Sequence, residues 1–200
     1  SSTHHILATL YNKILATGAA PSSWGESLIK LIHKKGTTDN PSNFRPIALS
    51  NTIGRTFHLI LADRTTDYLT RNGLIGPTVQ KAFIPGISGC TEHNTVMEEI
   101  IREVKNRKNT CHIAFFDLAD AFGSVPHDLI HHILNRNHFP QPVQEYFKNL
   151  YASTKSKVVT KTFQTDPFSF KKGVTQGNPM SPIIFILTFQ PIIDFILKYE

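Results

Sequence analysis

Residues 114–125 combine an apolar run with two acidic side chains. Asp117 follows Phe115 and Phe116 directly, and Asp120 comes three residues later. Carboxylate oxygens are ligands that a hard cation such as Mg²⁺ prefers, and phosphoryl transfer with two metal ions needs such carboxylates on a rigid element. The pattern therefore predicts a buried strand over residues 111–117 that ends in a magnesium-binding aspartate. The alternative interpretation is a core strand that simply ends at an aspartate in a turn.

A second candidate lies in residues 171–182, which contain Gly173, Gln176 and Gly177. Glycines let the backbone approach a ligand closely. Gln176 is a neutral hydrogen-bonding side chain just before a predicted helix, and the free N–H groups at a helix N-terminus favour phosphate. The segment therefore indicates contact with a phosphorylated ligand. The alternative is a Gly- and Pro-rich turn between a hairpin and a helix.

Basic residues form a third candidate, at Arg45 and at the adjacent pair Lys34 and Lys35. The planar guanidinium of Arg45 can hold two phosphate oxygens at once, and Pro46 with the apolar residues after it is expected to fix the Arg45 backbone. Either lysine would add a mobile point charge. For each lysine alone, an ordinary surface ion pair is the competing interpretation.

The elements that must position these residues can be predicted from periodicity. Apolar residues at helical spacing predict helices, at residues 4–17, 53–69, 91–104, 128–135, 143–151 and from about 179 onward. Alternating or β-branched segments predict strands, at residues 28–32 and 111–117 and, as a hairpin with its turn near 165–167, at residues 157–163 and 168–170. Helices mixed with such strand connections favour an α+β fold.

Composition limits the class of protein. The 200 residues suit one domain or two tightly coupled subdomains, and 40% hydrophobic against 18% charged residues is enough for a sizeable core. Lys plus Arg number 21 against 15 Asp plus Glu, and this formal net charge of +6 suits a polyanion such as nucleic acid. The apolar run 183–197 contains Gln190, Pro191 and Asp194 and is too short to span a bilayer comfortably, so it predicts a buried helix and no membrane partner.

The cysteines and the two ends of the chain suggest where the protein works. Cys90 and Cys111 form neither a disulfide framework nor a metal-ligand pair, which fits a reducing compartment. No secretory signal precedes the first predicted helix, so we expect a nuclear or cytoplasmic protein that is not secreted.

Because Ser1 is not Met and the last apolar pattern still runs at Glu200, we expect both ends to be cuts through a longer protein.

Taken together, the three motifs resemble reverse transcriptases of non-LTR retrotransposons. The resemblance is carried by segments in a fixed order, at residues 29–36, 41–47, 80–86, 116–122 and 173–177. It implies a right-hand polymerase, with residues 1–110 as fingers and residues 111–200 as a partial palm with a helical insertion at about 126–153. It also implies an RNA-directed DNA polymerase that uses Mg²⁺ to extend a DNA primer with dNTPs on an RNA template.

The resemblance assigns roles to individual residues. Asp117 matches the first catalytic carboxylate, which binds metal, and Leu118 matches a position whose backbone carbonyl faces a metal. Phe122 matches a bulky gate beneath the sugar that excludes a 2′-hydroxyl, which argues against the alternative of an RNA-dependent RNA polymerase. The implied nucleotide-binding residues are Arg45, Lys34, Lys35, Asp120, Ala121, Phe122, Gln176 and Gly177.

The sequence also departs from the family pattern. Gly123 and Asn178 stand where many relatives carry aspartate. The family's second carboxylate motif, an aspartate doublet, falls beyond Glu200 together with the remaining palm and the thumb. One carboxylate cannot neutralise two divalent cations, so we expect these residues alone to be inactive. A non-catalytic nucleic-acid-binding module or an inactive relic is therefore the alternative function.

Overall fold

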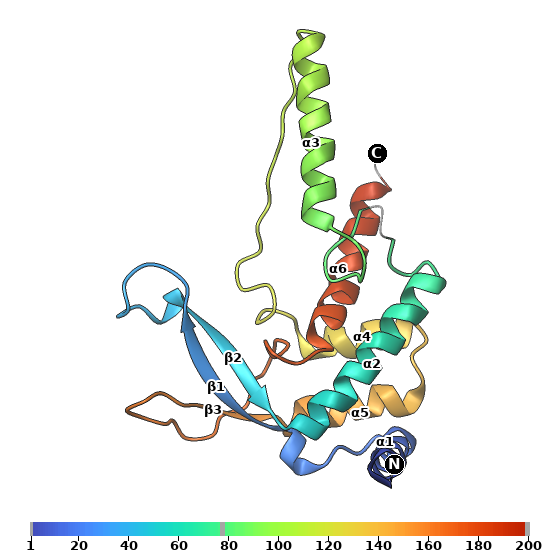
Figure 1. The fold of residues 1–200 in the computed structure, drawn as a ribbon, viewed down its shortest axis with the longest axis vertical. Helices are drawn as coiled ribbons and strands as arrows, with labels where there is room; N and C mark the ends of the chain where they lie inside the picture. Colours follow the sequence, from blue (N-terminus) through green and yellow to red (C-terminus); the bar gives the residue numbers. More distant parts are fainter. Residues whose placement is uncertain (1, 77–78, 199–200) are drawn as a thin grey trace.

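The computed structural model describes residues 2–76 and 79–198, which form a helical body, a small sheet and one projecting helix (Figure 1). The helices are α1 (Ser2–Thr17), α2 (Thr52–Arg71), α3 (Gly89–Asn106), α4 (His127–Arg136), α5 (Gln141–Ser153) and α6 (Ser181–Leu197). The strands are β1 (Glu26–His33), β2 (Phe44–Ser50) and β3 (Lys155–Val158), with short 3₁₀ turns at Ser22–Trp24 and Pro41–Asn43. The mixture of helix and sheet agrees with the predicted class.

Five of these helices form the body: α1 packs on α5, α4 packs on α5 and α6, and α2 packs on α6. Aromatic rings fill its centre, with Phe57 only 2% exposed and 5.2 Å from the rings of both Tyr11 and Tyr146. Trp24 lies against Gly54 so closely that a Cβ there would be 2.9 Å from the indole ring. The glycine therefore lets α2 and the Ser22–Trp24 turn share one core.

A buried polar pair lies inside this aromatic centre. The Nε2 atom of His58 is 2.7 Å from the Tyr146 hydroxyl, and no ionised partner accompanies it in the residues described. Burial lowers the pKa of His58 to about 4 and raises that of Tyr146. Both side chains are therefore neutral at pH 7 and satisfy each other by one hydrogen bond.

The sheet has the strand order β2-β1-β3. β1 and β2 form an antiparallel hairpin in which Ile29 lies opposite Ala48, and β3 joins the other edge of β1 in parallel. Pro46 is tolerated in β2 because this strand is at an edge and one of its N–H groups can be lost without breaking a ladder. The sequence predicted β1 but not β2.

The predicted strand over residues 111–117 is wrong. These residues form an irregular segment beside α3, and Phe115 and Phe116 are 82% and 95% exposed. A strand needs a neighbour for its N–H and C=O groups, and no strand of the described residues lies beside this segment. Among the described residues this apolar segment thus has neither a partner strand nor burial, and both parts of the prediction fail.

Helix α6 only partly matches its predicted burial. Its first half is buried, including Ile183, Ile184 and Leu187, whereas Ile192 and Ile196 in its second half are 51% and 57% exposed. Within residues 2–76 and 79–198, no helix is both long and apolar enough to cross a membrane. The other predicted helices are confirmed to within a few residues.

The predicted hairpin after α5 turns earlier than expected. The Thr160 N–H donates to the Phe163 carbonyl at 2.9 Å, so the chain reverses at residues 160–163 and not near 165–167. Ser156 in β3 then pairs with Phe168 through two backbone hydrogen bonds of 2.8 and 2.9 Å. The returning chain leads directly into the Gly173–Gly177 segment.

Candidate active site

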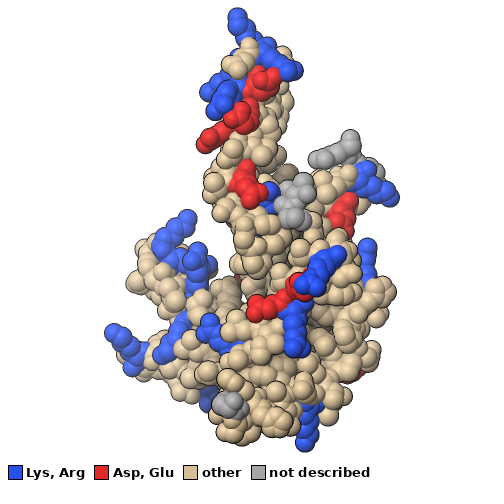
Figure 2. Space-filling model, turned by 45° about the vertical axis from the view of Figure 1, so that its right-hand side comes forward, with Lys and Arg blue, Asp and Glu red and all other residues tan. Residues whose placement is uncertain are grey.

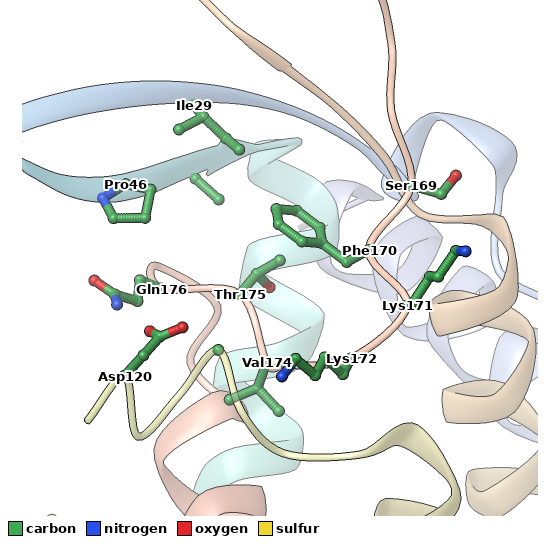
Figure 3. A pocket seen from close by; sticks show the side chains of 13 residues that line it. Ile29, Pro46, Asp120, Ser169, Phe170, Lys171, Lys172, Val174, Thr175 and Gln176 are labelled. Carbon is green, nitrogen blue, oxygen red and sulfur yellow. The ribbon is translucent and has the colours of Figure 1, made fainter. Parts of the chain in front are cut away.

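A cavity of about 380 Å³ lies where three parts of the chain meet (Figure 3). The sheet contributes Ile29, Pro46 and Ala48, and the turn after the 111–117 segment contributes Asp120 and Gly123. The remaining wall is the continuous segment 169–176, which ends in Gln176. The cavity thus joins the motifs at residues 114–125 and 171–182, although 45 residues separate them, and Pro46 and Ala48 come from the segment that carries Arg45.

Two backbone hydrogen bonds join these motifs. The Gly173 N–H donates to the Val125 carbonyl at 2.6 Å, and the Val174 N–H donates to the Phe122 carbonyl at 2.8 Å. Gly173 has a positive φ of 95°, and a Cβ there would lie 2.9 Å from the Cα of Gly123. Only glycine combines this backbone conformation with such a close approach. Gly123, a departure from the family pattern, lies at that contact.

The Gln176 segment is fixed from both sides. The Gln176 carbonyl accepts a hydrogen bond from the Ala48 N–H at 2.7 Å, at the free edge of β2. Gly177 has φ of 117°, and a Cβ there would be 2.4 Å from the Ala48 carbonyl oxygen. Further along, the amide oxygen of Asn178 accepts from the Met180 N–H at 2.9 Å. Asparagine therefore fulfils a local turn role that a carboxylate could also fill.

Asp120 lines the cavity, and Phe122 lies two residues further along the same turn, outside the lining residues. Asp120 has a positive φ of 49°, and its carbonyl accepts from the Ser124 N–H at 2.9 Å, which closes a tight turn around Ala121. The Phe122 ring stacks on Phe185 of α6 at 5.1 Å and meets the edge of Phe83 at 6.2 Å. This half-buried ring is thus held between α6 and the loop before α3.

Asp117 and Leu118 lie outside this cavity. Both residues are exposed, and one Asp117 carboxylate oxygen accepts a hydrogen bond from the Leu118 N–H at 3.0 Å. The parts of the chain that are described contain no cluster of three or more His, Cys, Asp or Glu side chains that could hold a metal ion. These residues therefore do not make a complete magnesium site, and we assign no reaction step to magnesium.

The predicted phosphate-binding cations also stand apart from the cavity. Side chains alternate between the two faces of a strand, so Arg45 points away from the face on which its neighbour Pro46 lines the cavity. Lys34 and Lys35 are exposed in the turn between β1 and β2. The structure thus brings together Asp120 and Gln176, but it does not bring Arg45 or Asp117 to them.

The structure brings to the site residues to which the sequence had assigned no role in nucleotide binding. Lys171 and Lys172 line the cavity, and their signal was a basic pair directly before Gly173. His127 stacks on Tyr151 at 4.7 Å, and its Nε2 atom lies 3.1 Å from the Gly173 carbonyl oxygen. This histidine therefore supports the close approach at Gly173, which no sequence spacing reveals.

Comparison with known proteins places this arrangement in a family. The family model described as reverse transcriptase (RNA-dependent DNA polymerase) matches residues 32–199. A Pol polyprotein from a type-1 R2 retrotransposable element of Nasonia vitripennis is 30% identical over 185 residues, which are 92% of this chain and 18% of the relative. The corresponding polyprotein of the type-2 element R2DM of Drosophila melanogaster is 28% identical over 188 residues, 94% of this chain and 17% of the relative.

A third relative carries an explicit activity in its name. The probable RNA-directed DNA polymerase from transposon BS of Drosophila melanogaster is 28% identical over 181 residues, 90% of this chain and 20% of the relative. The chain described here therefore belongs to the reverse transcriptase family, and these relatives come from non-LTR retrotransposons. It spans about a fifth of the length of these relatives.

Proposed function

We propose that this chain forms the fingers, residues 1–110, and part of the palm, residues 111–200, of an RNA-directed DNA polymerase. The family match over residues 32–199 supports this proposal most strongly. The cavity also supports this proposal, because residues of the Asp120 and Gln176 motifs line it together. The partners would be an RNA template, a DNA primer and a dNTP, inside the nucleus or the cytoplasm.

The cavity is the proposed nucleotide site. Asp120, Ala121, Gln176 and Gly177 would contact the incoming nucleotide, and Phe122 would limit the space beneath its sugar. A triphosphate is strongly anionic, and Lys171 and Lys172 in the cavity wall would supply positive charge beside it. Arg45, Lys34 and Lys35 lie outside this cavity, so the proposed nucleotide site does not include them.

Asp117 is the proposed catalytic carboxylate. It would contribute one ligand to Mg²⁺, together with the Leu118 carbonyl, and the other ligands would come from outside the described residues. Magnesium, when bound, would neutralise charge that builds up during phosphoryl transfer. The protein would hold the primer and the nucleotide in line for the reaction. The two reactants would then lose little further translational and rotational entropy on the way to the transition state.

The test is primer extension by the protein expressed from the complete reading frame that encodes this chain. We expect Asp117→Ala to lower dNTP incorporation on an RNA template at least about 100-fold while RNA affinity stays within about twofold. Asp166→Ala, which removes an exposed acid from the returning chain after the turn at residues 160–163, is the matched control and should remain active. Full incorporation by Asp117→Ala would contradict the proposal. RNA binding without incorporation by the unmodified protein would favour the non-catalytic module.

A further inference from the structure

The two faces of the sheet differ sharply in their surroundings. One face carries Ile29, Pro46 and Ala48 and lines the cavity. Strand alternation and the registers of β1 with β2 and β3 place a second set of side chains on the other face. We call this the outer face, and it carries Glu26, Leu28, Lys30, Ile32, Arg45, Ile47, Leu49, Lys155 and Lys157.

The outer face has an excess of positive charge. Its cations are Lys30, Arg45, Lys155 and Lys157, whereas Glu26 is the one acidic residue in the three strands. No ion pair is formed by any of these five residues within the described parts of the chain. Figure 2 shows the same asymmetry at larger scale, because the side of the molecule with the sheet carries basic side chains and hardly any acidic ones.

A hollow of about 620 Å³ lies at the β3 end of the outer face. Lys155 and Lys157 line it from β3, together with Leu28 and Leu49, which are 46% and 48% exposed. Asn51 and Ser23 add polar side chains at its rim, and Glu26 lies opposite Lys155 in the register. The hollow thus offers two cations, one carboxylate and two exposed leucines in a mostly polar lining.

We propose that the outer face binds the sugar–phosphate backbone of single-stranded RNA, with Lys155 and Lys157 contacting phosphates in the hollow. This inference rests on the proposed function and adds to it a path for RNA that lies on the opposite side of the sheet from the nucleotide cavity. Unpaired cations favour a polyanion, and a strand of RNA can follow a row of cations with its phosphates. The exposed leucines offer apolar contact to riboses and bases between those phosphates.

The test measures binding of the 200-residue chain to a short fluorescent single-stranded RNA by anisotropy at several salt concentrations. Each phosphate contact contributes roughly 0.7 to the slope of log K against log salt for single strands. The double variant K155Q/K157Q should therefore reduce that slope by about 1.4 and lower affinity about tenfold at low salt. The matched control K13Q/K105Q removes the same charge from exposed positions on α1 and α3.

The control should change affinity by less than about twofold. Equal losses in both double variants would overturn the proposal, because only net charge would then matter, and so would no RNA binding at low salt. Polyglutamate at matched charge should compete poorly; if it competes as well as RNA, the outer face binds acidic protein instead. A parent protein that fails to incorporate dNTPs would leave the salt dependence of RNA binding unchanged. The polymerase proposal and the RNA-binding proposal can therefore fail independently.

Discussion

The helical body and the projecting α3 have similar apolar sequence patterns, but their apolar side chains differ in burial. Both are amphipathic, and α3 presents Val96, Ile100 and Ile101 on one side. In the body, such residues are covered by neighbouring helices, and Tyr146 and Phe147 are fully buried. In α3 no residue is buried, and the following residues 107–118 are exposed as well. Apolar periodicity thus determines which segments become helical, whereas burial depends on a partner surface.

This difference divides the candidate site. Asp120 and Gln176 belong to the packed region, because residues 122–125 are bonded to residues 173–174 beside α6. Asp117 belongs to the exposed region, where its carboxylate accepts a hydrogen bond from the N–H of its neighbour Leu118. The described residues therefore contain the cavity proposed to bind the nucleotide, but they do not contain a complete set of metal ligands.

The largest contrast should come from equivalent substitutions in the two regions. Phe57→Ala in the body should lower the free energy of unfolding by about 3–5 kcal/mol, because it opens a cavity among packed rings. Phe116→Ala removes a ring that is 95% exposed and should change the free energy of unfolding by less than about 0.5 kcal/mol. Urea denaturation followed by circular dichroism measures both. Similar losses would mean that the exposed segment is packed in solution.

The second contrast is in pH dependence and arises from His58. Its folded-state pKa of about 4 lies below the ordinary value of 6.5, so the unfolded chain binds more protons between these values. Stability should be complete above pH 6.5 and should fall by about 3 kcal/mol as the pH drops to 4. His58→Gln should flatten this profile, whereas His112→Gln in the exposed segment should leave it unchanged. A flat profile for the unmodified chain would contradict burial of neutral His58.

The third and smallest contrast isolates the close approach at Gly173. Gly173→Ala and Gly86→Ala both place an alanine at positive φ, 95° and 78°, which costs about 1–2 kcal/mol each. Only the first also meets Gly123, whereas nothing lies within 4 Å of a Cβ at Gly86. Gly173→Ala should therefore cost about 1–3 kcal/mol more. Equal costs in thermal unfolding would show that residues 122–125 and 173–174 do not pack as described.

Sequence alone predicted the parts of the fold that depend on local pattern. The helices and β1 follow from apolar spacing, and their bounds differ from the structure by only a few residues. β2 was missed because Pro46 obscures a strand pattern that is acceptable only at a sheet edge. The strand over 111–117 was wrong because strand formation depends on a partner, which a single segment cannot reveal.

The sequence identified two motifs that the structure brings together, but it did not show how they meet. The motifs around Asp120 and Gln176 were both identified, and their meeting depends on contacts between Gly123 and Gly173 that no spacing encodes. The direction of Arg45 was equally hidden, because it depends on the register of β2 against β1. The prediction that Asp117 and Arg45 act on one nucleotide remains a prediction.

The most direct test of the nucleotide site is photolabelling with an azido-dNTP. The protein from the complete reading frame would be bound to an RNA template with a DNA primer, irradiated, digested and mapped by mass spectrometry. We expect label on residues 120–122 or 171–177, with protection by excess unmodified dNTP. Protectable label confined to other segments, with none on either side of this cavity, would contradict it.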